Sequence, residues 1–164
     1  RGLSPHNRRS RPEGLKMKEN LIGKEVVDAA VQIHSALGPG LLESVYERIL
    51  VEELTERGLF TARQVVVPIQ YRGLAFNEGF RADILVENLV LLELKSVEQL
   101  SKVHHKQLLL TYLKLRGLKL GYLLNFGAAL MKDGIKRMVN GLEDTKLGVF
   151  GPLREAYTRP SGDT

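Results

Sequence analysis

Cysteine is absent from this chain of 164 residues, which excludes disulfides, thiolate metal sites and cysteine nucleophiles. No apolar run approaches the roughly 20 residues that a helix needs to cross a bilayer, so we expect no membrane span. The first residues are basic, but no apolar core follows them, and we therefore expect no secretory signal and a cytoplasmic protein. The chain also lacks internal repeats, a Walker-type phosphate-binding loop and a recognisable Ser-His-Asp order. From these absences and the chain length, we expect a single soluble domain with its own hydrophobic core.

The net charge of +5 does not by itself indicate a partner, because it comes mostly from the ends of the chain. Residues 1–16 carry a net charge of +4, whereas residues 17–144 hold 16 Lys and Arg against 16 Asp and Glu. Residues 102–137 contain eight basic residues and one acid, and residues 19–56 contain eight acids and two basic residues. The basic second half could bind the phosphate backbone of a nucleic acid. A solvent-exposed helix face followed by charged strand ends would give the same distribution of basic residues.

The apolar pattern defines one domain, residues 17–144, between two segments that lack it. Residues 1–16 are rich in Pro, Gly and Arg and are expected to be disordered, and residues 145–164 are expected to be a C-terminal tail. Within the domain, periodicity and turn residues predict two helices, three strands, a helix and two strands. The predicted helices span residues 21–37, 41–54 and 102–115, and the predicted strands span residues 64–71, 78–86, 89–97, 118–126 and 134–139.

This order predicts a small α/β domain with a mixed sheet whose first three strands form a meander. Pro68 lies in the first predicted strand and has no N–H to donate to a ladder. The first strand should therefore lie at the edge of the sheet or contain a bulge.

Three charged residues interrupt the two apolar strands in FRADILVENLVLLELKS, which begins at Phe80. They are Asp83, Glu93 and Lys95. A buried charge is costly unless a metal, a partner or water compensates it. Two acids and a lysine on adjacent strands are what a hard divalent cation, Mg²⁺ or Mn²⁺, and a water nucleophile require. The alternative is that Glu93 and Lys95 form a solvated pair and that Asp83 marks a strand end.

The turn between these two strands decides whether the charged side chains share a face. Glu93 and Lys95 are two residues apart on one strand and lie on the same face. A two-residue turn would point Asp83 away from Glu93. A three-residue loop would pair Val86 with Val90 and set the two carboxylates opposite each other, and a bulge in either strand would do the same. A metal site therefore predicts the longer loop or a bulge.

Two helices contribute further candidates. In GPGLLESVYE, residues 38–47, Glu43 lies in the first turn of the second helix, where an acid also simply complements the helix dipole. In HHKQLLLTYLK, Gln107 lies on a polar stripe with Thr111 and Lys114. The outer face of any amphipathic helix has such a stripe, so this pattern also has two explanations.

GPGLLESVYE, FRADILVENLVLLELKSVEQL and LKLGYLLNFG together closely resemble the bacterial GxxExxY protein family, which is assigned to the PD-(D/E)xK nuclease-like superfamily. The resemblance covers nearly all of the segment that has a regular apolar pattern. It implies a restriction-endonuclease-like core, a mixed sheet of about five strands that begins with a three-stranded meander and is flanked by helices. It also implies divalent-metal-dependent phosphodiester hydrolysis as the ancestral chemistry.

Carried over by position, the resemblance assigns the family's motifs to individual residues. Asp83 matches the first acid, although Ala82 stands where the superfamily label has proline. Glu93 and Lys95 match the acid–lysine pair. The residues that match the name motif are Gly40, Glu43 and Tyr46.

Gln107 matches the family's polar residue on the helix that follows the acid–lysine strand. In the family this helix usually reads Gln-Leu-Leu-Thr-Tyr-Leu, whereas three leucines separate Gln107 from Thr111 here. The extra residue rotates Gln107 by about 100° relative to Tyr112 in a regular helix.

The resulting hypothesis is a metal-dependent nuclease that hydrolyses nucleic-acid phosphodiester bonds, with DNA as the expected substrate. Asp83 and Glu93 would hold Mg²⁺ or Mn²⁺, and Glu43 would hold or tune the metal. Lys95 would position the attacking water or stabilise the transition state. The small size suggests a homodimer or a partner protein. The alternatives are a non-catalytic nuclease-fold module that binds or regulates, and an enzyme acting on another phosphoester.

Overall fold

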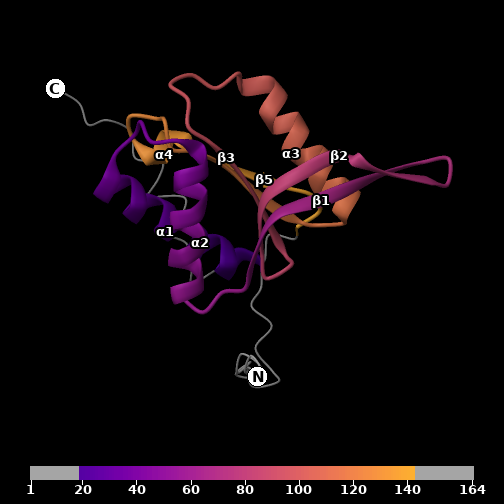
Figure 1. The fold of residues 1–164 in the computed structure, drawn as a ribbon, viewed down its shortest axis with the longest axis horizontal. Helices are drawn as coiled ribbons and strands as arrows, with labels where there is room; N and C mark the ends of the chain where they lie inside the picture. The colour runs from indigo at the N-terminus through magenta and orange to yellow at the C-terminus, as the bar shows by residue number, and fades with distance from the viewer. Residues whose placement is uncertain (1–18, 143–164) are drawn as a thin grey trace, which may run out of the picture.

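The computed structural model describes residues 19–142 and is shown in Figure 1. Its helices are α1 (Glu19–Leu37), α2 (Glu43–Glu56), α3 (Lys102–Arg116) and the short α4 (Met131–Gly134). Its strands are β1 (Thr61–Tyr71), β2 (Leu74–Val86), β3 (Val90–Lys95), β4 (Leu120–Asn125) and β5 (Ile135–Val139). The element order is the predicted one, with α4 as the addition. The segments 1–16 and 145–164, predicted to be disordered and a tail, lie outside the described residues.

The five strands form one mixed sheet in the order β1-β2-β3-β4-β5. The pairs β1–β2, β2–β3 and β4–β5 are antiparallel, and α3 connects the parallel pair β3–β4. The predicted α/β class with an opening three-stranded meander is therefore confirmed. β1 is an edge strand, and its register shifts between Val67 and Ile69, on either side of Pro68. The predicted edge position is confirmed, and the extra residues at the register shift opposite Pro68 lie on β2.

Helices cover both faces of the sheet. One buried cluster joins α1 and α2 to the sheet through residues such as Ile22, Leu50 and Leu92. A second cluster joins α3 to the other face through Leu91, Leu109 and Leu123. Because β3 and β4 are covered on both sides, they are apolar almost throughout, and this is why the charged residues in β3 stand out. Among the described residues, no helix is both long and apolar enough to cross a membrane.

The β1–β2 hairpin is longer than predicted and projects from the body of the protein (Figure 1). β1 begins three residues earlier than expected and β2 begins four residues earlier, at Leu74. The tip turn places Arg72 at φ +50° and Gly73 at φ +78°. Gly73, Asn77 and Gly79 interrupt the strand pattern in the sequence, so alternation alone does not predict the extension of β2 back to Leu74.

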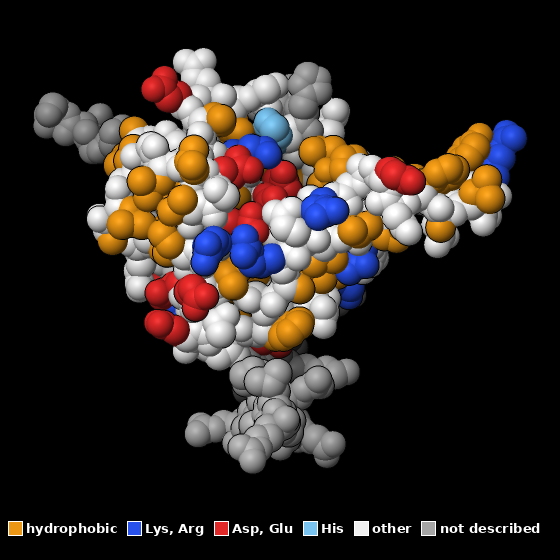
Figure 2. All heavy atoms as spheres, in the orientation of Figure 1, with side chains coloured by type: hydrophobic (Ala, Val, Ile, Leu, Met, Phe, Trp, Pro, Cys, Tyr) orange, Lys and Arg blue, Asp and Glu red, His pale blue; other side chains and the backbone are white. Residues whose placement is uncertain are grey.

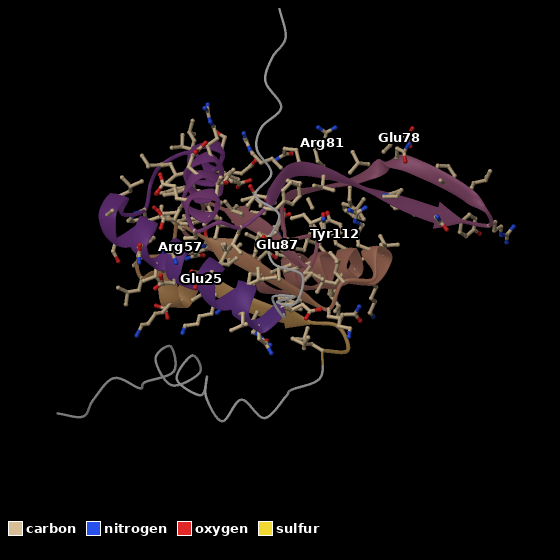
Figure 3. All side chains as sticks on the ribbon, turned by 90° about the horizontal axis from the view of Figure 1, so that it is seen from below. Glu25, Arg57, Glu78, Arg81, Glu87 and Tyr112 are labelled. Atoms are coloured by element: carbon tan, nitrogen blue, oxygen red, sulfur yellow. The ribbon has the colours of Figure 1, made fainter. Side chains whose placement is uncertain are left out.

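Arg57, just after the last turn of α2, links that helix to α1, and Figure 3 shows it beside Glu25. Its guanidinium donates to Glu25 Oε2 at 3.0 Å and to Asp28 Oδ2 at 2.7 Å. It also donates to Glu53 Oε1 at 2.9 Å and 3.0 Å. Burial would lower the pKa of Arg57, but the three carboxylates outweigh burial and raise it.

Replacing Arg57 with methionine should lower the free energy of unfolding by about 2 kcal/mol, because the charge-assisted hydrogen bonds to two helices disappear together. Urea unfolding followed by circular dichroism measures the change. Arg48→Met is the matched control, since Arg48 is exposed on the same helix, and it should change stability by less than about 0.5 kcal/mol. Equal effects of the two variants on the free energy of unfolding would show that stability depends on the loss of a positive charge and not on the link between the helices.

Candidate active site

The hairpin between β2 and β3 has the three-residue loop that a shared site requires. Val86 pairs with Val90, and Ile84 pairs with Leu92, so the next positions on the two strands are those of Asp83 and Glu93. The loop turns through two left-handed residues at φ +52° and +56°, and the Leu89 N–H donates to the Val86 carbonyl at 3.0 Å. The prediction of the longer loop is confirmed.

The structure brings four of the five predicted site residues together. Lys95 Nζ lies 3.1 Å from Glu93 Oε1 and 4.0 Å from Glu43 Oε1, which places the first turn of α2 against the end of β3. Asp83 Oδ2 accepts a hydrogen bond from the Leu94 N–H at 2.7 Å, so its carboxylate reaches across to β3. Figure 2 shows acidic side chains gathered at the centre of this face, with Lys and Arg side chains around them.

Glu93 is the most perturbed of these groups. It is 8% exposed, and its Oε2 is buried without a hydrogen-bond partner in the described part of the chain. Burial, followed by the charge of Asp83, raises its pKa to about 7, and Lys95 only partly offsets this. Burial likewise raises the pKa values of Asp83 and Glu43. The sheet therefore holds acidic oxygens where they are poorly solvated and poorly compensated, which is typical of functional sites.

Lys95 remains a cation in this setting. Burial alone would lower its pKa, but the charges of Glu93, Glu43 and Asp83 outweigh burial and raise it. A lysine with a raised pKa cannot accept a proton near neutral pH. Its side chain is therefore suited to attract and orient a negatively charged group.

The acidic residues fit a small hard cation through two carboxylates. Within residues 19–142, no three acidic or histidine side chains form a metal-binding group. Mg²⁺ typically keeps several waters and uses only one or two carboxylates, so Asp83 and Glu93 suffice as protein ligands. The unpartnered Oε2 of Glu93 is an oxygen that could bind a cation without breaking a hydrogen bond. The ligand roles of Asp83, Glu93 and Glu43 stay predictions.

The other two residues of the GxxExxY pattern build the turn that presents Glu43. Gly40 has φ +107°, a conformation that favours glycine. The Tyr46 hydroxyl donates to the Gly38 carbonyl and accepts from the Leu41 N–H. The Tyr46 ring also stacks on Phe126, with ring centroids 4.4 Å apart. Gly40 and Tyr46 are therefore structural, and Glu43 alone among the three faces Lys95.

The segment that follows Lys95 is held by the end of β4. Asn125 is buried, and its side-chain oxygen accepts from the N–H groups of Val97 and Gly127, both at 3.1 Å. Its amide nitrogen donates to the Val97 carbonyl at 2.8 Å. Asn125 and Gly127 lie in the sequence block LKLGYLLNFG, and their contacts give that block a physical role, which is to fix the chain just after Lys95.

Sequence reasoning missed a polar link between α2 and Asp83. Gln64 has φ +51°, and its side-chain amide donates to Glu47 Oε2 at 3.0 Å and to Asp83 Oδ1 at 3.4 Å. The neighbouring Arg63 donates to Glu47 Oε1 at 2.9 Å. The only available signal was that Glu47 follows Glu43 by four residues and so lies on the same face of α2. The link holds Asp83 from the side opposite Leu94.

Gln107 lies apart from these contacts. Its side chain is exposed, and among the described residues no hydrogen bond joins it to the carboxylates. Tyr112 is the buried residue of α3 that faces the site: burial and then the charges of Glu93 and Asp83 raise its pKa. Its ring packs edge to face on Phe80 (Figure 3 marks Tyr112). The polar stripe containing Gln107 is thus the outer face of an amphipathic helix, and a role for Gln107 in the site stays a prediction.

Comparison with known families agrees with this geometry. The family model described as the PD-(D/E)XK nuclease superfamily matches residues 20–138, well over half of the chain. No curated protein and no solved structure matches it. The mixed five-stranded sheet flanked by helices is consistent with the restriction-endonuclease-like fold expected from the resemblance. The chain belongs to the PD-(D/E)XK nuclease superfamily.

Proposed function

We propose that this protein is a divalent-metal-dependent nuclease that hydrolyses phosphodiester bonds of DNA, and that it is a GxxExxY-type member of its superfamily. The observation that carries the proposal is Glu93. Its carboxylate is buried, has a pKa near 7, leaves one oxygen without a partner, and lies beside the cation of Lys95. A residue with only a structural role in a strand would lose stability through such an arrangement, because a buried carboxylate without a partner is costly.

Asp83 and Glu93 would hold the metal, Mg²⁺ or Mn²⁺, and Glu43 would hold or tune it. When bound, the metal would supply an activated water and neutralise charge on the phosphate. Lys95, which stays protonated, would attract the scissile phosphate and stabilise the negative charge that develops on its oxygens. Gln64 and the Leu94 N–H would keep the Asp83 carboxylate in place. The Asn125 side chain would keep the chain beyond Lys95 from shifting.

The proposal is tested by cleavage of labelled single-stranded, duplex and branched DNA, with matching RNA, in Mg²⁺, Mn²⁺ or EDTA. We expect metal-dependent products from the wild type and from the control Asp133→Asn, whose carboxylate is exposed on α4. Asp83→Asn should lower the rate by about 10²- to 10³-fold, because it removes one ligand charge.

Other outcomes are equally decisive. No cleavage of any substrate by folded protein would overturn the proposal. Retained nucleic-acid binding in that case would instead support a non-catalytic module. Equal rates for Asp83→Asn and Asp133→Asn would place the chemistry elsewhere.

A further inference from the structure

The outer part of the β1–β2 hairpin, residues 69–81, forms an arm in which residues 70–78 are all exposed, and Phe80 packs on Tyr112 at its base. It extends beyond the body in Figure 1, and Figure 2 shows hydrophobic and basic side chains at its end. Tyr71 is 60% exposed, Leu74 is 61% exposed and Phe76 is 43% exposed. A two-stranded ribbon without a covered face is marginal by itself, so large exposed apolar side chains at its tip need an explanation.

The strand register gathers these side chains on one face of the arm. Tyr71 pairs with Leu74, and Ile69 pairs with Phe76. Because alternate residues on a strand share a face, and directly paired residues share it too, all four lie on the same side of the ribbon. Gln70 and Ala75 occupy the other side. The arm therefore has one apolar face with two aromatic rings.

The arm starts at the candidate active site. Leu74 and Asp83 are nine positions apart on β2, a distance of about 30 Å at 3.3 Å per residue. Between residues 69 and 81, Arg72 and Arg81 lie along the hairpin against a single acid, Glu78, and Arg63 nearer the site is paired with Glu47. Arg81 projects on the side away from α3 (Figure 3). The Arg72 guanidinium lies over the Tyr71 ring, 5.2 Å from its centroid. The arm therefore carries a net charge of +1, with one arginine at its tip and one toward the site.

We propose that the arm binds a single-stranded segment of the nucleic-acid substrate, a refinement that rests on the proposed function. The aromatic rings at the tip stack on bases, and the arginines contact phosphates. Unpaired bases fit because their faces are open, whereas a duplex must first be unstacked at a cost. Charge argues against a second copy of the chain as the occupant, because two such arms would bring arginines together. A DNA strand that lies along the arm would place about nine nucleotides on it before reaching the site, at the stacked spacing of 3.4 Å each.

The test measures binding of fluorescent single strands of 6 and 18 nucleotides, and of an 18-base-pair duplex, in EDTA so that no cleavage occurs. The compared variants are Phe76→Ser, at the tip, and Phe60→Ser, whose ring is similarly exposed at 57% just before β1 begins. We expect the 18-mer to bind Phe76→Ser about 5- to 20-fold more weakly than it binds the wild type or Phe60→Ser. The ratio of 18-mer to 6-mer affinity should fall in the same variant only.

Three results would overturn the arm proposal: equal 18-mer binding by both variants, tighter binding of the duplex than of the single strand, or a dimer in sedimentation that Phe76→Ser dissociates while binding is kept. Cleavage of the 18-mer by Phe60→Ser in Mg²⁺ tests the nuclease separately. If the protein cleaves the 18-mer but binding does not depend on the arm, only the arm proposal is wrong. If binding depends on the arm but no cleavage occurs, only the proposed catalysis is wrong.

Discussion

Replacing Glu93 with glutamine should abolish metal-dependent cleavage, by at least about 10²- to 10³-fold, and at the same time stabilise the metal-free protein. In the proposed mechanism the carboxylate holds the metal, but without the metal it is a buried charge with an unsatisfied oxygen. Glutamine keeps the shape of the side chain and removes the charge. Activity and stability are therefore expected to change in opposite directions at this one position, as they often do at functional sites.

The stability gain depends on pH in a defined way. Burial and Asp83 raise the pKa of Glu93 from 4.5 to about 7 in the folded protein. The ionised carboxylate therefore destabilises the folded state by about 3 kcal/mol above pH 7, since each pKa unit corresponds to about 1.4 kcal/mol. This penalty decreases as the pH falls from 7 to 4.5 and is absent below pH 4.5, where both states are protonated. Glu93→Gln should therefore stabilise the protein at about pH 8 and have no such effect at about pH 4.

Thermal unfolding in EDTA at several pH values measures this effect, and a parallel series with Mg²⁺ measures metal binding. The wild type should gain stability from Mg²⁺, and Glu93→Gln should not. Glu98→Gln, an exposed acid three residues beyond Lys95, is the matched control and should behave like the wild type. If Glu93→Gln instead failed to fold, Glu93 would be structural, and the proposed catalytic role would fail with it.

Replacing Gly127 with alanine should destabilise the protein by about 3 kcal/mol and weaken Mg²⁺ binding. A Cβ at this position would overlap the Val97 nitrogen and lie 2.5 Å from the Val97 carbonyl oxygen. These are backbone atoms, so no side-chain rotation relieves the overlap. The chain after Lys95 would have to move, and the three hydrogen bonds of the Asn125 side chain would be disturbed.

Chemical denaturation gives the loss of stability, and the Mg²⁺-dependent rise in melting temperature gives the effect on the site. Ala129→Ser, an exposed substitution two residues along the same turn, should leave both unchanged. A stable Gly127→Ala protein with normal Mg²⁺ response would show that the Val97 segment is not held against this turn.

The element order and the candidate charged residues of the two site strands could be predicted from the sequence because both follow from local pattern. The apolar residues around Glu93 in the sequence indicate a strand that is buried on both faces. A charged side chain is costly in such a strand, so Glu93 was a candidate for a functional role. Side-chain alternation also showed that a two-residue turn would separate Asp83 from Glu93, whereas a three-residue loop or a bulge would bring them together, and the structure has the three-residue loop. The missing N–H of Pro68 predicted an edge strand or a bulge for the same local reason, and β1 is an edge strand.

Contacts between distant segments could not be predicted in this way. Gln64 meets Glu47 and Asp83 across two different elements, and Asn125 meets Val97 28 residues earlier in the chain. The rotation of α3, which buries Tyr112 and exposes Gln107, is set by packing against β1 and β4. The polar stripe alone was compatible with either orientation.

The sequence by itself determined the order of the elements, the presence of acids and a lysine in apolar strands, and the residue types a metal would need. Only the tertiary structure decided which of these groups are buried together, how far the pKa of Glu93 rises, and which neighbours hold them in place. It also decided that no other part of residues 19–142 covers the apolar end of the β1–β2 hairpin. The physical reason is that burial and electrostatic coupling depend on distances between segments remote in the chain, which no local pattern contains.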